Sequence, residues 1–473
     1  MIADLGKGGP FGGQVLVVGF RVTGQAVAGY LRSREMGVLA VDDAPTEAVV
    51  ARAAALGIDL VVRPDEQQLS GLLGACRTVV VSPGIPVSHA IYRLAASAGV
   101  PVYSELELGW QRLLARAEAG TVASLVAVTG TNGKTTVTSL TAAMLVESGL
   151  TSVAAGNIGL PFIDAAGLDA DVLVAEVSSY QLQFTQHFHP TVSCWLNLTE
   201  DHLDWHPTMA HYRAAKARVW ANQGPGDVAV VNADDPAVMA AVNDPDHALP
   251  SGVRPVTFSI GSRADFHVAR RSPGDDLLMG PQGLALVGTA ELPRALPLDL
   301  VNSLAAAATA LAAGATPEGC RAALRQFTGL PHRIELVAQG AGVRWYDDSK
   351  STTPASVLAA VAGFDSVVLI AGGRNKGLDL SILGRAGPKV HTVVAIGDAA
   401  EEIERAFSGT VPVIRAETMA EAVAAAGGAA VAGDAVLLSP GCASFDWYRS
   451  YAERGDEFVA LVNARVGNEE SRL

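Results

Sequence analysis

The stretch VAVTGTNGKTTVTSL, residues 126–140, decides the fold of the central part of the chain. An apolar strand leads into a glycine–threonine turn, which opens a helix, so backbone N–H groups and the helix N-terminus can surround an anion. Lys134 then reaches the outer phosphates, and the hydroxyl of Thr135 or Thr136 can bind Mg²⁺. The spacing is GxxGKT and not the common GxxxxGKS, so a general nucleotide-hydrolase label fits imperfectly. The alternative is an ordinary glycine-rich turn, but the strand–turn–helix context favours a nucleotide site.

Length and composition describe a large globular α/β protein. The chain has 473 residues, of which 49% are hydrophobic and 5% aromatic, and it contains 49 glycines. This length exceeds what one hydrophobic core organises and predicts about three domains. The formal net charge of −14 argues against nucleic acid as a partner, because binding a phosphate backbone needs clustered positive charge.

Cysteine usage and the short apolar segments indicate a soluble cytoplasmic protein. The cysteines lie far apart and show no CxxC spacing, which argues against a disulfide framework or a zinc site. They are Cys76, Cys194, Cys320 and Cys442. The N-terminal segment MIADLGKGGPFGGQ has no apolar signal-peptide core, and the alanine-rich stretches are interrupted before membrane-spanning length. We therefore expect no membrane insertion, and we expect a monomer.

The order of apolar segments predicts three α/β domains. From Gln14 a strand, a glycine turn, a helix and a second strand ending at Asp42 and Asp43 form a βαβ unit. Polar residues 115–124 are interpreted as a linker, and the Gly/Pro-rich residues 250–297 predict short strands. We expect an N-terminal Rossmann-like domain (1–118), a central P-loop ATPase-type parallel sheet with a small β insert (119–329) and a C-terminal Rossmann-like domain (330–473).

Charged residues follow two apolar strands of the central part. Glu176 ends the strand DVLVAEVSS, where a carboxylate is unfavourable unless it serves a ligand or metal. The segment NLTEDHLDWH offers oxygen and imidazole ligands for Mg²⁺ or Mn²⁺, although a solvated charged loop is an equal alternative. These ligands are Glu200, Asp201, His202, Asp204 and His206. Taken alone, Lys216 has the pattern of a helix-surface lysine.

In the third part, each of three apolar strands is followed by a loop with hydroxyl or lysine side chains. WYDDSKSTTPAS contains Asp348, Lys350 and Thr352, while the other two loops hold Lys376 or Ser439 and Ser444. Because parallel strands end at one edge of a sheet, this pattern predicts a cleft for an anionic small molecule. Helix caps and solvent loops are the alternative interpretation.

An ordered set of motifs in this chain resembles the Mur ligases, the ATP-dependent enzymes that build the peptide stem of peptidoglycan. The set is GTNGKTT, GNIG, EVSSYQL, NLTEDHLD, RAAKARVW, PHR, DDSKST, GGRNKG and SPGCASFDWYRSYAERG, and it spans the chain. Within the family, SPGI, DDSKST and ASFDWYRSYAERG are most similar to the branch that adds D-glutamate. The resemblance thus implies a ligase that joins D-glutamate to UDP-N-acetylmuramoyl-L-alanine through an acyl phosphate.

The resemblance also implies one substrate for each domain. The first domain would bind the uridine nucleotide, and the second ATP with two Mg²⁺ ions, or Mn²⁺. Implied uridine-nucleotide and sugar–peptide contacts are Thr23, Asp42, Asp43, Ser82, Gly84 and Asn157. Implied ATP contacts are Gly130, Thr131, Asn132, Gly133, Lys134, Thr135, Thr136, Asn302, Arg333 and Asp348. Implied metal ligands are Thr135, Glu176, His202 and Lys216 as a carbamate, and Lys350, Thr352, Lys376, Ser444, Phe445 and Tyr451 would surround D-glutamate.

Two positions depart from the family pattern. Arg21 stands in the first glycine turn, GFRVTG, where the family often has glycine. Ahead of Asn302 the family commonly shows a His–Asn pair, but this chain has Leu298 and Asp299. These departures therefore affect the contacts to the pyrophosphate and to adenine that the resemblance implies.

Two other functions compete with a ligase. The first βαβ unit, with Asp42 placed 42 − 24 = 18 residues after Gly24, is compatible with a nicotinamide-dependent oxidoreductase, but the chain lacks GxGxxG there. A non-catalytic ATP-binding regulator would need no intact set of Lys134, Glu176 and His202, and the chain retains all three.

Overall fold

The computed structural model describes residues 11–120, 123–203, 205–261, 263–270 and 276–470. The chain divides into two compact units. The first comprises Met1–Leu198, Trp205–Glu291 and Asn302–Gln326, and the second comprises Thr199–Asp204, Leu292–Val301 and Phe327–Leu473. Each of the described helices fails to combine the length and the apolar character that a membrane-spanning segment needs.

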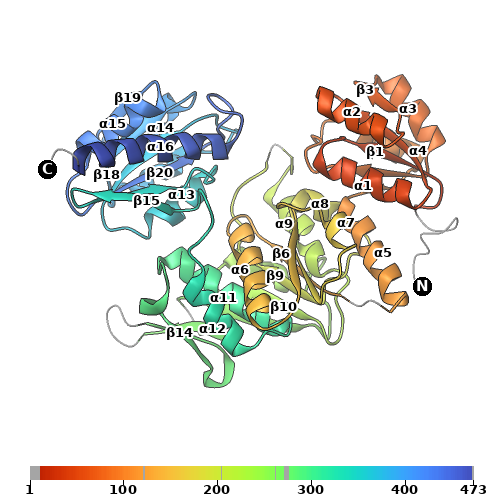
Figure 1. The fold of residues 1–473 in the computed structure, drawn as a ribbon, viewed down its shortest axis with the longest axis horizontal. Coiled ribbons are helices and arrows are strands. Elements are labelled where there is room, and N and C mark those ends of the chain that lie inside the picture. The colour runs from red at the N-terminus through yellow and green to blue at the C-terminus, as the bar shows by residue number, and fades with distance from the viewer. Residues whose placement is uncertain (1–10, 121–122, 204, 262, 271–275, 471–473) are drawn as a thin grey trace. The chain divides into compact units, whose positions relative to one another are not determined.

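The first sheet is built from the N-terminal residues (Figure 1). Its strands are all parallel, in the order β3-β2-β1-β4-β5. Val15 and Val17 face one apolar core and Leu16 and Val18 face another, so helices cover both sides of the sheet. The strands are β1 Gln14–Val18, β2 Gly37–Asp42, β3 Leu60–Val62, β4 Thr78–Val81 and β5 Val102–Tyr103, and the helices are α1 Val22–Ser33, α2 Glu47–Ala55, α3 Glu66–Ala75, α4 Ala90–Ala98 and α5 Glu105–Glu118.

The part of the second sheet that the structure describes has nine strands, in the order β14-β13-β12-β11-β10-β9-β6-β8-β7. Strands β6 to β12 pair in parallel, while β13 and β14 add an antiparallel edge, which confirms the predicted short strands. The strands are β6 Ser124–Thr129, β7 Ser152–Gly156, β8 Val172–Glu176, β9 Val192–Trp195, β10 Val228–Asn232, β11 Arg254–Ser259, β12 Phe266–Ala269, β13 Leu277–Met279 and β14 Ala285–Gly288.

Among the described residues of the central part of the chain there are seven α-helices. The predicted linker at residues 115–124 is wrong in part, because α5 continues through the helix-favouring residues ARAE to Glu118 and β6 begins at Ser124. The helices are α6 Lys134–Glu147, α7 Phe162–Ala165, α8 Ser179–Gln183, α9 Met209–Ala217, α10 Pro236–Val242, α11 Pro297–Ala312 and α12 Pro317–Gln326.

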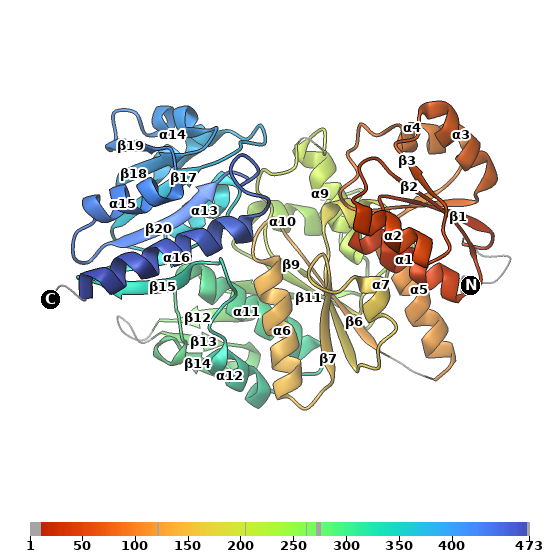
Figure 2. The same cartoon turned by 45° about the horizontal axis from the view of Figure 1, so that its top comes forward.

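The third sheet, in the second unit, has the order β15-β16-β20-β17-β18-β19 (Figure 2). Only the β15–β16 pair is antiparallel among the described strands of this sheet. Helix α16 packs on one face through Phe458 and Val462. The strands are β15 Glu335–Gly340, β16 Val343–Asp347, β17 Val367–Gly372, β18 Val390–Ile396, β19 Val413–Ala416 and β20 Ala435–Gly441, and the helices are α13 Pro354–Val361, α14 Ala400–Phe407, α15 Met419–Ala429 and α16 Tyr451–Glu470.

Candidate functional site

The phosphate loop joins β6 to α6 in the middle of the second sheet. Gly130 and Gly133 adopt positive φ angles of 155° and 83°, which L side chains disfavour. A Cβ atom at Gly133 would also lie 2.7 Å from Asn302 Oδ1. The loop therefore requires glycine at Gly133 both for its backbone and for the approach of Asn302.

Asn197, which sequence reasoning missed, holds the loop in shape. Its Oδ1 accepts hydrogen bonds from the backbone N–H groups of Thr131 (3.0 Å) and Asn132 (2.8 Å), and its Nδ2 donates to Asn132 O (3.1 Å). Only its place as the first residue of NLTEDHLD, directly after a strand, hinted at this role. The loop is thus organised by the protein itself.

Two lysines converge on one carbonyl of the loop. Lys134 Nζ donates to Gly130 O (2.9 Å) and to Thr131 O (2.8 Å), and Lys216 Nζ donates to the same Gly130 O (2.7 Å). Lys216 is 1% exposed and lies 4.8 Å from the centre of the Tyr212 ring. The interpretation of Lys216 as a surface lysine is therefore wrong, and two cations at one loop favour a polyanionic ligand.

Glu176 ends β8 with a buried carboxylate that is 2% exposed. Its Oε1 accepts a hydrogen bond from Asn157 Nδ2 (3.0 Å), whereas Oε2 has no hydrogen-bond partner among the described residues. A buried carboxylate oxygen without a partner is costly, and it is a ligand that a divalent cation accepts readily. Glu176 therefore fits a metal site.

The other candidate ligands divide between the two units. His202 has a positive φ of 57°, and its Nε2 lies 3.3 Å from Asp201 Oδ2. His206 is buried, with Nε2 2.9 Å from Ser179 Oγ and Nδ1 3.0 Å from His211 Nδ1. Glu200 is exposed, Thr135 and Thr136 are half-buried in the first turn of α6, and Asp204 lies outside the described residues.

A cavity of about 510 Å³ opens at the carboxyl ends of the first sheet. Its walls include the six residues expected to contact the uridine substrate, together with Arg21. Those six are Thr23, Asp42, Asp43, Ser82, Gly84 and Asn157. Asp42 accepts hydrogen bonds from the backbone N–H groups of Phe20 (2.7 Å) and Ala44 (2.9 Å), so its carboxylate shapes the turn.

In the second unit, Asp348 follows β16 and is buried. Its Oδ2 accepts a hydrogen bond from Ser439 Oγ (2.7 Å), and its Oδ1 accepts one from Ile334 N (3.3 Å). Burial raises the pKa of Asp348 to about 6, while the hydroxyls of Ser351 and Ser439 oppose the rise. Neighbouring Asp347 lies 2.6 Å from His332 Nδ1. The carboxyl of Asp348 is thus fixed for polar contact.

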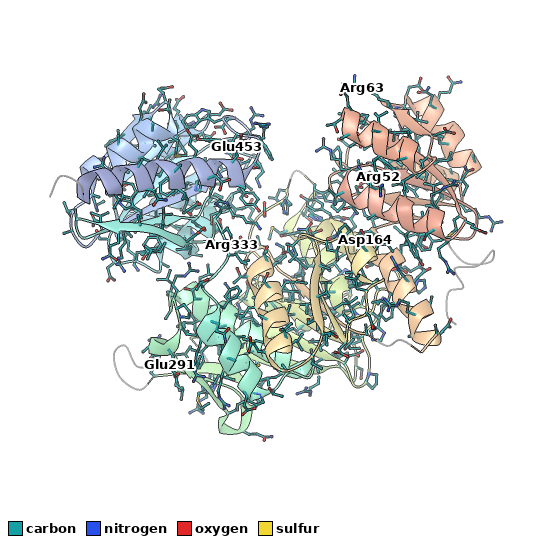
Figure 3. The ribbon with its side chains drawn as sticks, in the orientation of Figure 1. Arg52, Arg63, Asp164, Glu291, Arg333 and Glu453 are labelled. Atoms are coloured by element: carbon teal, nitrogen blue, oxygen red, sulfur yellow. The ribbon has the colours of Figure 1, made fainter. Side chains whose placement is uncertain are left out.

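The departures before Asn302 have a structural explanation. Asp299 pairs with Arg294 in two contacts of 2.6 and 2.7 Å, and the Arg294 guanidinium also donates to Arg333 O (3.1 Å). Leu298 packs against the apolar core of the third sheet. Half-buried Arg333, labelled in Figure 3, is thereby held through its backbone at the entry to β15.

The residues expected around D-glutamate are more exposed. Lys376 is exposed, Phe445 is 64% exposed, and Lys350 Nζ lies 5.1 Å from the centre of the Tyr451 ring. Ser444 is buried and Thr352 is half-buried. These six residues belong to loops or first helical turns of the second unit.

Family models match the chain in three successive segments: the "Mur ligase MurD-like, N-terminal domain" at 13–104, the "Mur ligase middle domain" at 128–309 and the "Mur ligase, glutamate ligase domain" at 332–442. The chain belongs to the Mur ligase family. The UDP-N-acetylmuramoylalanine--D-glutamate ligase of Frankia casuarinae is 42% identical over 471 residues, covering 96% of this chain and 94% of its own. The ligase of the same name from Desulfosudis oleivorans is 41% identical over 460 residues, covering 95% and 96%.

Solved structures support the same three-part α/β fold for this Mur ligase. UDP-N-acetylmuramate-alanine ligase MurC from Thermotoga maritima aligns with a TM-score of 0.58 at 19% identity, covering 96% of this chain and 99% of its own. MurF from Acinetobacter baumannii aligns with a TM-score of 0.59 at 19% identity, covering 90% and 91%. The expected fold class is therefore confirmed.

Sequence reasoning also missed Arg454 of this Mur ligase. Its guanidinium is buried and donates to Ser349 O (2.7 Å), Ser349 Oγ (3.0 Å) and Cys442 O (3.2 Å). These contacts tie the loop after β16 to the loop after β20. The final motif YAERG contains Arg454, but only the fold shows that it joins two loops.

Proposed function

We propose that this Mur ligase joins D-glutamate to UDP-N-acetylmuramoyl-L-alanine and converts ATP to ADP and phosphate. The observation that carries the proposal is the sequence identity of 42% and 41%, over nearly the full length of the chain, to two ligases that carry this name. The geometry agrees, because the Nζ of Lys134 lies at the phosphate loop, where it donates to Gly130 O and Thr131 O. A nicotinamide oxidoreductase or a non-catalytic regulator gains no support from this arrangement.

The three substrates are assigned to separate parts of the chain. The cavity of the first sheet takes the uridine nucleotide, with Asp42 and Ser82 in its walls, and its size suits a small-molecule ligand. The phosphate loop and Asn302 are assigned to ATP, and Arg333 and Asp348 are assigned to the same nucleotide. We assign these roles to domains at residues 1–118, 119–329 and 330–473.

Metal binding is assigned to Glu176, Thr135 and His202, with Mg²⁺ as the natural ion and Mn²⁺ as a substitute. The unpartnered Oε2 of Glu176 supports this assignment. When bound, Mg²⁺ neutralises negative charge on the phosphates. We assign a second ion to Lys216, whose amine would add to CO₂ with loss of a proton to form a carbamate, an oxygen ligand in place of a cation.

The reaction proceeds in two displacements. A carboxylate oxygen of the L-alanyl group attacks the γ-phosphorus of ATP, the bond to ADP breaks, and an acyl phosphate forms. The amine of D-glutamate, losing a proton, attacks the acyl carbon, and phosphate leaves with the electrons of the C–O bond. Lys134 stabilises negative charge that develops on the phosphoryl oxygens. Positioning by the protein replaces most of the entropy cost of bringing the reactants together.

D-Glutamate is assigned to the loops of the third sheet. Lys376 offers a cation for a carboxylate, the hydroxyls of Thr352 and Ser444 accept or donate hydrogen bonds, and Phe445 with Tyr451 supplies apolar surface. Lys350 is held beside the Tyr451 ring, so it belongs to the same group. We also propose that the enzyme works as a monomer in the cytoplasm, the compartment that supplies ATP and the nucleotide substrate.

Phosphate release from ATP tests the proposal. The purified enzyme is given ATP and Mg²⁺ with UDP-N-acetylmuramoyl-L-alanine, D-glutamate, both or neither, and the peptide product is measured by mass spectrometry. Release of phosphate together with product, only when both substrates are present, is the expected result. Release that is indifferent to D-glutamate, or that accompanies L-glutamate equally well, would overturn the assignment.

A further inference from the structure

The carboxylate of Glu105 is deeply buried, and the chemistry above does not use it. Glu105 is the first residue of α5 and is 1% exposed. A buried carboxylate is costly unless it is hydrogen-bonded. Its Oε2 accepts from Ile163 N (3.1 Å), and its Oε1 accepts from Phe162 N (3.4 Å) and Gln181 Nε2 (3.3 Å). The side chain therefore joins α5 to both α7 and α8.

The partners of Glu105 flank two loops of the proposed site. Phe162 and Ile163 open α7, and the loop before α7 carries Asn157. Gln181 lies in α8, a short helix that follows Glu176 at the end of β8. The Oε1 of Gln181 accepts hydrogen bonds from Ser178 N (3.0 Å) and Ser178 Oγ (2.8 Å), so the connection continues to the end of β8.

The same two loops meet at Glu176. Asn157 N donates to Glu176 O (2.9 Å), and Asn157 Nδ2 donates to Glu176 Oε1 (3.0 Å). Gly156 has a φ of 100°, and a Cβ atom there would lie 2.3 Å from Glu176 O. The two loops are in close backbone contact at this point, so a shift of either loop displaces the carboxylate of Glu176 or the amide of Asn157.

We propose that Glu105 is a positioning residue of the ligase, which holds the loops bearing Asn157 and Glu176 in register through α7 and Gln181. This inference rests on the proposed function. Glu105 touches no reacting atom. It fixes the distance between a side chain of the nucleotide cavity and a proposed metal ligand, and catalysis is sensitive to such positions.

The charge of the Glu105 carboxyl changes near neutral pH. Burial raises the pKa of Glu105 to about 7, and Asp164 on α7 raises it further, while the N–H groups of Ile163 and Phe162 and the amide of Gln181 lower it. Asp164 is labelled in Figure 3; burial raises the pKa of its carboxyl, and the charge of Arg112 on α5 opposes that rise. Only the ionised carboxylate leaves both oxygens free to accept all three hydrogen bonds.

Glu107 provides a matched control on the same helix. Its side chain is 0% exposed, and it accepts hydrogen bonds from the backbone N–H groups of Gln186 (2.7 Å), His187 (2.9 Å) and Phe188 (3.2 Å). These residues follow α8 and belong to neither of the two site loops. Glu107→Gln therefore removes an equally buried carboxylate without loosening the connection between Asn157 and Glu176.

The test compares the rates of Glu105→Gln and Glu107→Gln with the parent enzyme from about pH 5.5 to about pH 9. Because glutamine mimics the protonated acid, kcat of Glu105→Gln should match the parent near pH 6 and fall about tenfold below it near pH 8.5. The apparent Mg²⁺ requirement should rise with that loss. Glu107→Gln, whose carboxylate in the parent also lies 2.8 Å from His187 Nδ1, should keep the parental Mg²⁺ requirement at both ends of this pH range. The proposal would be overturned if the ratio of kcat of Glu105→Gln to kcat of the parent did not vary with pH, or if the same ratio for Glu107→Gln varied with pH to the same extent.

Thermal unfolding separates positioning from loss of the fold. Since the folded-state pKa of Glu105 lies above its usual value, its contribution to stability is full at low pH and is lost as pH rises through about 7. Glu105→Gln should therefore unfold no earlier than the parent at about pH 8.5, where its activity is lowest. A variant that is inactive there because it unfolds would contradict a positioning role.

Hydrogen exchange at about pH 8.5 reports on these contacts directly. The amides of Phe162 and Ile163 should be less protected in Glu105→Gln than in the parent, because a carboxylate that accepts from both is replaced by an amide. Unchanged protection would overturn the proposal. If the parent is active but Glu105→Gln shows neither the pH-dependent loss of kcat nor the loss of amide protection, only this inference fails. A parent that forms no product at any pH contradicts the proposed function itself.

Discussion

The charged side chains at the phosphate loop are buried or half-buried, whereas Lys376, the cation proposed to bind D-glutamate on the third-sheet loops, is exposed. Lys216 and Glu176 are buried at the phosphate loop and bonded to Gly130 O and Asn157. Lys376 and Phe445 of the third sheet are exposed. A site that stabilises developing charge benefits from groups already fixed in place, because they need no reorganisation during the reaction. A site that admits a small amino acid from solution can keep its side chains open.

The largest expected effect lies at the phosphate loop. Lys134→Ala should lower kcat by about a hundredfold to a thousandfold, because it removes a preorganised cation from the phosphoryl oxygens. Steady-state rates at saturating ATP measure this loss, and circular dichroism checks that the protein is folded. Lys134→Arg keeps the charge and should retain more activity. A folded Lys134→Ala enzyme with parental kcat would falsify the role of this lysine and the contrast drawn above.

Glu176→Gln should have the next largest effect. The substitution keeps the shape but removes the charge, so we expect half-saturation to need at least about ten times more Mg²⁺. Stability should be retained, since a buried charge with an unpartnered oxygen is removed. Mg²⁺ titrations of activity provide the measurement, with Glu200→Gln as an exposed control. If the titrations of Glu176→Gln and the parent overlay, Glu176 is not a metal ligand.

Lys376→Ala probes the open side of the comparison. We expect KM for D-glutamate to rise about tenfold and KM for ATP to stay within about twofold, because one charge-assisted hydrogen bond to a carboxylate is lost. Lys389→Ala is the control, since its Nζ donates to Ala362 O in the same unit. An equal rise in both KM values would remove Lys376 from the amino-acid site.

Phe445→Ala should produce the smallest effect. Its ring is 64% exposed, so truncation should leave the unfolding temperature unchanged and raise KM for D-glutamate only about threefold. Phe458→Ala is the contrasting control, because that ring is fully buried and its loss should cost about 3–5 kcal/mol of unfolding free energy. A marked drop in the melting temperature of Phe445→Ala would mean that this loop is not open.

Local patterns in the sequence predicted the strand ends that carry the proposed site, because apolar runs followed by Gly, Ser, Lys or Asp specify a strand and its loop. They did not predict the burial of Lys216, which depends on how α9 packs onto a loop far away in the sequence. Nor did they identify Asn197 or Arg454, whose roles come from bonds to distant backbone atoms. Such contacts have no periodic signature.

Transfer of an oxygen label tests the central claim, which is ligation through an acyl phosphate at the phosphate loop. UDP-N-acetylmuramoyl-L-alanine with ¹⁸O in its alanyl carboxylate is converted with ATP and D-glutamate, and the released phosphate is examined by mass spectrometry. The account predicts one ¹⁸O atom in each phosphate, because a carboxylate oxygen bonds to phosphorus before the amine attacks carbon. Product formation with unlabelled phosphate would contradict it.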